Sequence, residues 1–95
     1  MHVISRKALL DFAKAHPDAA ETLDNWYRRV KKATWQNLAD VRRDYPHADL
    51  VARCTVFNVG GNKYRLITKI KYEKATVFVR AVLTHRVYSK GGLEK

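Results

Sequence analysis

The chain has 95 residues, which supports one compact domain over residues 1–95 but leaves it a thin hydrophobic core. Hydrophobic residues make up 46% of the chain, which excludes an intrinsically disordered protein, and no apolar run is long enough to cross a bilayer. With 19 Lys and Arg against 9 Asp and Glu, the net charge is +10, which favours a polyanionic partner: nucleic acid, an anionic membrane surface or an acidic protein.

The first half of the chain predicts helices. Val3-Ile4, at the start, is a short apolar pair suited to a strand at a sheet edge. Ser5 is expected to cap a first helix, and the fixed backbone of Pro17 suits the first turn of a second, in which apolar residues recur every three or four positions. Asn37 is expected to cap a third, short helix over residues 38–44.

From Cys54 onward the pattern changes to that of β-strands. A strand is expected over Cys54–Val59, followed by a hairpin turn at Gly60-Gly61-Asn62. A second strand then runs over 63–72, and a third over 76–84 after another tight turn. Two tight turns predict an antiparallel meander with the helices packed on its apolar face.

The second of these strands has two different faces. Its even positions are mostly apolar, whereas its odd positions carry a row of cations that only Ile67 interrupts: Lys63, Arg65, Lys69 and Lys71. A two-residue turn in the first hairpin would place Asn58 beside Lys63 and Arg65. The same parity at Glu73-Lys74 would bring Arg80 to that face. A three-residue turn would reverse either placement, because a one-residue slip moves every side chain to the other face.

The cationic face has two explanations. It is either a solvated surface, since Lys and Arg commonly blunt exposed sheets, or a binding surface for a polyanion. Residues 54–95 carry 9 Lys and Arg against 2 Asp and Glu, compared with 10 against 7 in residues 1–53. Four cations on alternate positions of one strand repel one another, and a bound polyanion would relieve that repulsion.

Titratable groups follow the third strand. His85 and Tyr88 are three residues apart and would project together if the chain turns there; otherwise they are a loop histidine and a tyrosine that anchors the tail. The sequence has no glycine-rich phosphate loop, and the basic half has no pair of carboxylates suited to acid–base catalysis. Cys54 is a lone cysteine, so neither a disulfide nor a metal site is expected, and a reducing compartment, the cytoplasm, fits best.

Several segments in order and spacing match a known family pattern. They start with Ile4-Ser5-Arg6-Lys7-Ala8-Leu9, continue through His16-Pro17-Asp18-Ala19 and Trp26-Tyr27-Arg28, and are most specific at Val56-Phe57-Asn58-Val59-Gly60-Gly61-Asn62-Lys63-Tyr64-Arg65-Leu66, with Thr84-His85 and Tyr88 after it. In these segments, the sequence resembles the HigB toxins of bacterial type II toxin–antitoxin systems, a branch of the RelE-like endoribonuclease superfamily.

The resemblance implies an α+β fold of the RelE-like kind, with two to three N-terminal helices packed on a small antiparallel sheet of three to four strands. It also implies a toxin that cleaves mRNA on the ribosome by metal-independent attack of a ribose 2′-OH on the adjacent phosphate, without a cofactor. The expected partners are the mRNA, the ribosome and a HigA-like helix-turn-helix antitoxin; no membrane is expected.

The demands of that reaction can be matched to residues as a hypothesis. Arg65 would stabilise the charge of the phosphorane with a bidentate contact, His85 would transfer a proton, and Tyr88 would orient the phosphate, stack on a base or donate a proton. The RNA itself would be bound by a larger group of polar and cationic side chains: Asn58, Lys63, Lys69, Lys71 and Arg80. Arg65 and His85 are both expected to face solvent.

Two other functions are compatible with the same basic sheet. A non-catalytic RNA- or DNA-binding module needs the cationic face but neither His85 nor Tyr88. A docking surface for an acidic protein needs no nucleic acid at all, and predicts weak RNA binding that vanishes at moderate salt.

Overall fold

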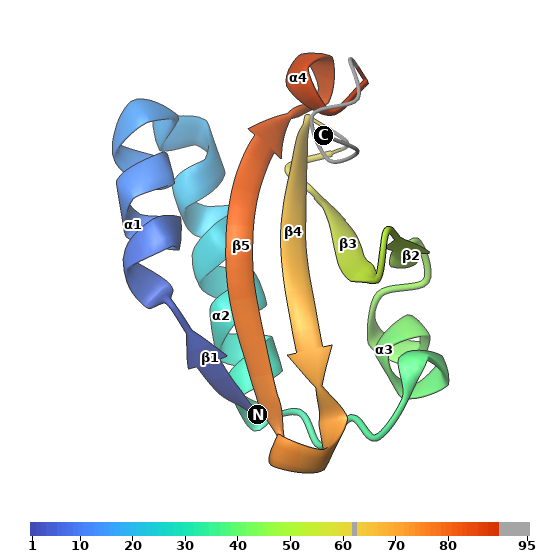
Figure 1. The fold of residues 1–95 in the computed structure, drawn as a ribbon. Helices are drawn as coiled ribbons and strands as arrows, with labels where there is room; N and C mark the ends of the chain where they lie inside the picture. Colours follow the sequence, from blue (N-terminus) through green and yellow to red (C-terminus); the bar gives the residue numbers. More distant parts are fainter. Residues whose placement is uncertain (62, 90–95) are drawn as a thin grey trace.

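The computed structural model describes residues 1–61 and 63–89, and has an α+β fold in which helices pack on one five-stranded sheet (Figure 1). The strand order is β1-β5-β4-β3-β2. The predicted class is therefore confirmed, with one strand more than the predicted maximum of four. In chain order the elements are β1 (His2–Ile4), α1 (Arg6–Ala15), the 3₁₀ turn η1 (Pro17–Ala19), α2 (Ala20–Lys32), α3 (Leu38–Asp44), β2 (Asp49–Val51), β3 (Cys54–Val59), β4 (Tyr64–Lys71), the 3₁₀ turn η2 (Tyr72–Lys74), β5 (Thr76–Thr84) and α4 (His85–Ser89).

The three predicted helices are present, and their ends show how local sequence sets them. The Asn37 side chain accepts a hydrogen bond from the Asp40 backbone N–H at 3.0 Å, which confirms the predicted cap. Ser5 has the extended backbone of a cap, but its side chain makes no capping hydrogen bond. Pro17 begins η1, so that α2 starts only at Ala20. In the described part of the chain, no helix is long and apolar enough to cross a membrane.

The edge strand β1 makes the sheet mixed, which corrects the prediction of a purely antiparallel one. Val3-Ile4 belongs to β1, which lies at the sheet edge as expected but runs parallel to β5, with His2 opposite Thr76. At the other edge β2 pairs antiparallel with β3. Both strands are three residues long, too short for an alternating pattern to predict their pairing.

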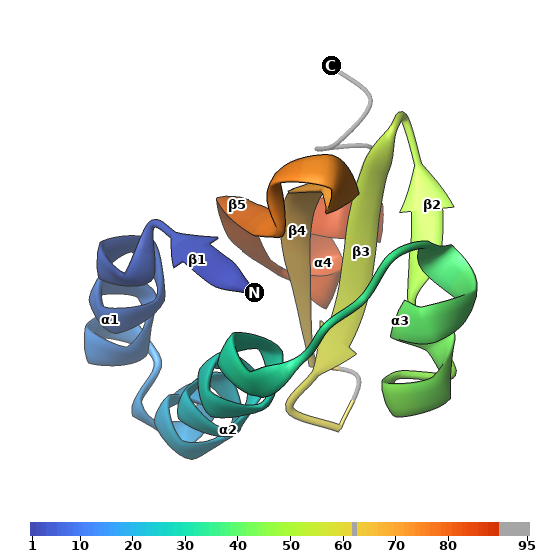
Figure 2. The same ribbon diagram turned by 90° about the horizontal axis from the view of Figure 1, so that it is seen from below.

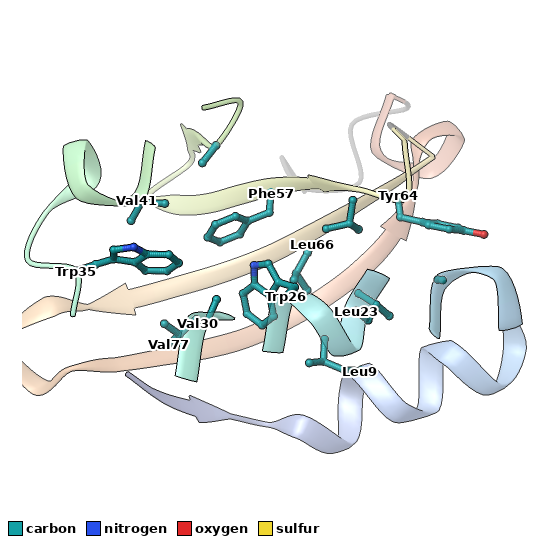
Figure 3. Close-up of a cluster of buried hydrophobic side chains, with 13 residues drawn as sticks. Leu9, Leu23, Trp26, Val30, Trp35, Val41, Phe57, Tyr64, Leu66 and Val77 are labelled. Carbon is teal, nitrogen blue, oxygen red and sulfur yellow. The ribbon is translucent and has the colours of Figure 1, made fainter. Parts of the chain in front are cut away.

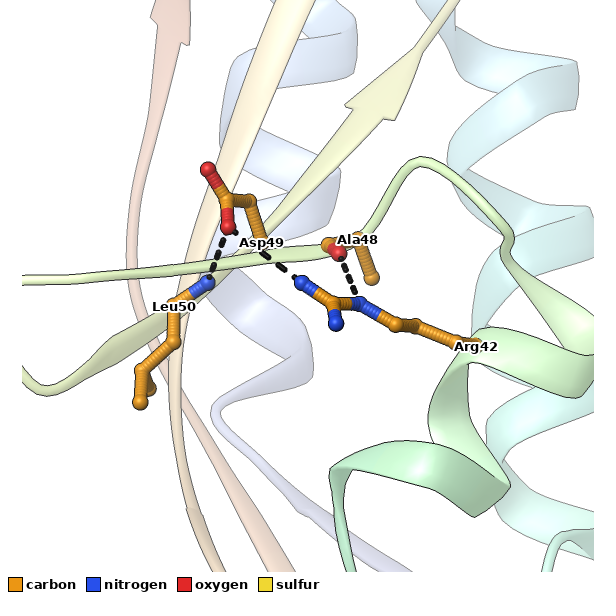
Figure 4. Close-up of polar contacts among 4 residues, drawn as sticks. All are labelled: Arg42, Ala48, Asp49 and Leu50. Carbon is orange, nitrogen blue, oxygen red and sulfur yellow. Dashed lines mark hydrogen bonds and ion pairs between the residues drawn. The ribbon is translucent and has the colours of Figure 1, made fainter.

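A small polar cluster ties β2 to α3 (Figure 4). The Arg42 guanidinium donates from Nε to the Ala48 carbonyl at 3.0 Å and approaches the Asp49 carboxylate at 3.4 Å. The same carboxylate oxygen accepts from the Leu50 backbone N–H at 2.9 Å. These contacts fix β2 to α3, and so they supplement the few hydrogen bonds that this three-residue edge strand makes with β3.

The first hairpin has the predicted parity. Asn58 pairs with Arg65 and Val59 with Tyr64, the register predicted for a two-residue turn at Gly61-Asn62, and the Lys63 N–H donates to the Gly60 carbonyl at 3.3 Å. Asn58 and Arg65 therefore share a face as expected. Gly60 and Gly61 both have positive φ, near +60°, as a tight connection requires. Asn62 lies outside the described residues.

The second hairpin has the predicted register at its turn. Lys71 pairs with Thr76, as a two-residue turn at Glu73-Lys74 requires, and the Ala75 N–H donates to the Tyr72 carbonyl at 3.0 Å across that turn. Farther along, a bulge interrupts the β4–β5 ladder between Ile67 and Thr68. Arg80 is the extra residue of β5 at this bulge. The extra residue of a bulge and its neighbour point to the same side of a strand, so exposed Arg80 lies on the face opposite the core. From Ala81 onward, the alternation of β5 side chains between the two faces is shifted by one residue.

The hydrophobic core lies between the helices and the even face of β4 (Figure 3). The Trp26 indole of α2 meets the Phe57 ring of β3 edge-on at 5.4 Å, and Leu66 of β4 is fully buried with them. Figure 2 shows α1 and α2 together on one side of the sheet, with α3 beside β2 and β3. The opposite face of the sheet, called the outer face below, carries a smaller buried pair of cross-strand partners, Val56 and Ile67.

We expect Ala75→Gly to raise the free energy of unfolding by about 1 kcal/mol. Ala75 is exposed and has φ of 48°, where a Cβ costs roughly 1–2 kcal/mol, and the extra chain entropy of glycine offsets only part of that gain. Urea denaturation would measure the change. Ala33→Gly is the matched control: Ala33 has φ of −74°, so there glycine should destabilise. A loss of stability in Ala75→Gly would contradict the prediction.

Candidate active site

Two elements bring Arg65, His85 and Tyr88 to one end of the sheet, where β5 ends and α4 begins (Figure 1). Arg65 is the second residue of β4, and His85 and Tyr88 belong to the five-residue helix α4. Residues three apart in a helix lie on the same side, as the sequence predicted if the chain turned here. The Arg65 guanidinium carbon lies 5.5 Å from the centre of the Tyr88 ring, in cation–π range.

Arg65 is buried, with 8% of its surface exposed, which corrects the expectation that it faces solvent. Its NH1 atom donates to the Tyr64 carbonyl at 3.3 Å, and the Tyr88 ring lies beside its guanidinium. Exposed Asn58 is its partner across the ladder in β3, as predicted. A cation held this way has a fixed direction before any ligand arrives.

His85 is exposed and is anchored through its backbone. Its N–H donates to the Lys63 carbonyl at 2.9 Å, which joins the start of α4 to the β3–β4 loop. The Thr84 hydroxyl accepts from the Val87 backbone N–H at 3.2 Å and so caps α4 at its first turn. The Thr-x-x-Val spacing gave only a weak sign of this cap, and the helix itself was not predicted.

The other predicted cations lie apart from this group. Lys69 and Lys71 share the outer face of β4 with Arg65, but are four and six residues away, or roughly 13 and 20 Å along the strand. Lys69 and Arg80 are exposed, and Lys71 is half-buried. Lys63 is exposed in the β3–β4 loop, with its ammonium 3.7 Å from the Asp18 carboxylate. The structure thus gives one compact group and a looser row of cations along the outer face.

One contact at this end of the molecule was missed entirely. The Tyr64 hydroxyl donates to both carboxylate oxygens of Asp18, each at 2.8 Å. This hydrogen bond is the main cause that lowers the pKa of Asp18 and raises the pKa of Tyr64. The two residues are 46 positions apart, so no local pattern could have revealed their contact.

The chemistry available at this end of the sheet is that of a phosphate site. A guanidinium can neutralise a phosphoryl oxygen, an imidazole can accept or donate a proton near neutral pH, and a phenol can donate a hydrogen bond. Among residues 1–61 and 63–89, no three His, Cys, Asp or Glu side chains gather as a metal site would require.

Comparison with known proteins gives a consistent family. The family model of HigB toxins, described as the RelE-like toxic component of a toxin-antitoxin system, matches residues 19–91. The mRNA interferase toxin HigB of Escherichia coli strain K12 is 30% identical over 91 residues, which cover 93% of this chain and 88% of that protein. The mRNA interferase HigB of Shigella flexneri matches to the same extent, and that of Escherichia coli O6:H1 is 29% identical over 93 residues, or 95% and 90% of the two chains.

The Asp18–Tyr64 hydrogen bond predicts a defined dependence of stability on pH. Because folding lowers the pKa of Asp18, its contribution is present above the ordinary value of 3.8 and is lost as the pH falls through the lowered value. Because folding raises the pKa of Tyr64, its contribution is present below 10.0 and is lost as the pH rises through the raised value.

Urea denaturation of the wild type and of Tyr64→Phe at a series of pH values would test this. The stability difference between them should be largest near neutral pH and should shrink in acid. Tyr27→Phe, which removes a phenol hydroxyl from α2, is the control and should show no such acid-dependent difference. An equal gap between wild type and Tyr64→Phe at every pH would contradict the prediction.

Proposed function

Since this chain belongs to the HigB family of RelE-like toxins, we propose that it is the toxin of a type II toxin–antitoxin system and acts as an endoribonuclease on mRNA. The observation that carries the proposal is the contact of the Arg65 guanidinium with the Tyr88 ring at one end of a cationic sheet face, where α4 also carries His85. The relatives' names supply the substrate, since they are mRNA interferases.

The reaction proposed is attack of a ribose 2′-oxygen on the adjacent phosphorus. The 2′-oxygen loses its proton to a base, the bond from phosphorus to the 5′-oxygen breaks, and an acid protonates that leaving oxygen. The products are a 2′,3′-cyclic phosphate and a 5′-hydroxyl end. The proposal is metal-independent because side chains at this site supply both the proton transfers and the charge stabilisation.

Each residue has a separate role in this proposal. Arg65 neutralises the negative charge that accumulates on the phosphorane, and its burial strengthens that attraction because little water screens it. Exposed His85 exchanges a proton with the 2′-oxygen or the 5′-oxygen. Tyr88, half-buried against Arg65, orients the phosphate or stacks on a base.

The RNA path follows from where the cations lie. Asn58 stands beside Arg65 on β3, and Lys69, Lys71 and Arg80 extend along the outer face away from the reacting phosphate. They would hold the RNA backbone on one side of the cleavage site through its phosphates. Lys63 would contribute from the β3–β4 loop, although its ammonium is shared with Asp18.

The setting of the reaction is also part of the proposal. We place it on the ribosome, in the cytoplasm, where mRNA is held extended and single-stranded. The antitoxin that a toxin of this family requires would be a HigA-like helix-turn-helix protein, and the net charge of +10 suits an acidic segment of such a partner.

Removal of the His85 imidazole should abolish most cleavage without unfolding the protein. Because His85 is exposed, we expect His85→Ala to lose roughly 10²- to 10⁴-fold in the cleavage rate, with little change in melting temperature. Primer extension on ribosomes programmed with a defined mRNA would measure the rate. His47→Ala, which removes an exposed histidine from the loop between α3 and β2, is the matched control and should cut as the wild type does.

The same experiment separates the competing functions. Equal cutting by His85→Ala and the wild type would remove His85 from the chemistry but keep the nuclease. A folded wild-type protein that binds RNA and makes no cuts would instead identify a non-catalytic nucleic-acid-binding module.

The cationic row on β4 makes a second prediction, about salt. If Lys69 and Lys71 each neutralise one phosphate, the plot of log affinity against log salt should lose roughly 0.7 in slope for each lysine changed to alanine. The probe is a single-stranded mRNA fragment with 2′-O-methyl riboses, which cannot be cleaved. Lys7→Ala with Lys14→Ala removes two exposed charges from α1 and is the control. Equal losses of slope in the Lys69/Lys71 variant and in the Lys7/Lys14 variant would show that net charge, and not the outer face, binds the RNA.

A further inference from the structure

Tyr64 lies where the helical layer, the β3–β4 loop and the active-site strand meet. Its hydroxyl donates to both oxygens of Asp18 in η1, each at 2.8 Å. Its ring packs edge-on against Phe12 at 5.2 Å and His16 at 5.5 Å, both from the helical layer. A Cβ built on Gly60 would lie only 2.9 Å from the same ring, so the tyrosine also supports the loop directly.

The backbone on either side of this tyrosine holds the two proposed catalytic residues. The Lys63 carbonyl accepts from the His85 backbone N–H at 2.9 Å, and the Tyr64 carbonyl accepts from Arg65 NH1 at 3.3 Å. Tyr64 is also the ladder partner of Thr84, which caps α4. A shift of the tyrosine would therefore move both the imidazole and the guanidinium relative to the RNA.

We propose that Asp18 and Tyr64 form a clamp that positions Arg65 and His85 for cleavage, and that both are positioning residues of this enzyme. The inference rests on the proposed function and deepens it. It holds that the Asp18–Tyr64 hydrogen bond, which touches no reacting atom, sets the geometry of Arg65 and His85. Lys63 adds to the clamp, since its ammonium contacts Asp18 while its carbonyl holds His85.

The position of the bond favours such a role over one in folding alone. The Asp18 side chain is half exposed, so water can solvate its carboxylate when the tyrosine hydroxyl is removed. The Tyr64 ring would keep its packing against Phe12 and His16 in Tyr64→Phe. What changes is the direction in which the start of β4 is held, and a displacement of about 1 Å at a catalytic group can cost roughly 10²-fold in rate.

The test is a set of single-turnover cleavage measurements on ribosomes programmed with a defined mRNA. We expect Tyr64→Phe and Asp18→Ala each to lower the maximal rate roughly 10- to 100-fold, with the half-saturating protein concentration changed less than about twofold. The double variant should be no slower than the slower single one, because both act through one bond. Asp18→Asn keeps an acceptor for the hydroxyl and should restore most of the rate, whereas Tyr27→Phe should be unaffected.

A second measurement does not depend on activity. Hydrogen exchange of the His85 backbone amide, which the Lys63 carbonyl protects, should become roughly 10-fold faster in Tyr64→Phe, while amides in the centre of β4 stay unchanged. If the His85 amide exchanges faster in Tyr64→Phe but the wild-type protein cleaves no RNA, the clamp is kept and the proposed function is overturned.

Several results would overturn the clamp itself. These are an active wild type whose rate and His85 exchange are unchanged in Tyr64→Phe, additive losses in the double variant, an Asp18→Asn rate as low as that of Asp18→Ala, or rate losses that follow the melting temperature alone.

Discussion

Strand β4 has to serve two faces of the sheet at once, and both the fold and the proposed chemistry depend on its register. It is the central strand, flanked by β3 and β5 along its length. Its even residues pack against the helices, whereas its odd residues carry Arg65 and Lys69 to the outer face. A slip of one residue would push Lys69 into the core and expose Leu66. The hairpin loop, the bulge and the Asp18–Tyr64 bond all oppose that slip.

The burial of Arg65 determines how strongly its charge can act in the proposed reaction. A guanidinium removed from water is costly unless it is well partnered, and here the Tyr64 carbonyl and the Tyr88 ring contact it from two sides. Val56 and Ile67, the next pair along the same two strands on the outer face, are buried too. An arginine beside an apolar patch is screened less than one in open solvent, so it attracts a phosphate more strongly. In the proposed function, Lys69 and Lys71, farther along β4, would bind the RNA less specifically, as point charges on flexible stems.

How far the sequence predicts this protein depends on how local each signal is. Helices α1 to α3, the Asn37 cap, the two hairpins and the Asn58–Arg65 pair all follow from patterns within a dozen residues. The β1–β5 pairing, the bulge at Arg80, the burial of Arg65 and the Asp18–Tyr64 bond depend on segments that meet only in three dimensions. Likewise, the cationic strand indicated the candidate site, but not that α4 would follow at one end of it.

The parallel pairing of β1 with β5 has a consequence for synthesis. The β1–β5 edge of the sheet can form only after Thr76, more than seventy residues after its partner His2, has been synthesised. His85 and Tyr88 are made later still, and α4 can dock on β4 only after it has left the exit tunnel. If the proposed function holds, the chain therefore lacks two of its three proposed catalytic residues until almost all of it has been translated. A chain that terminates before α4 would lack both His85 and Tyr88.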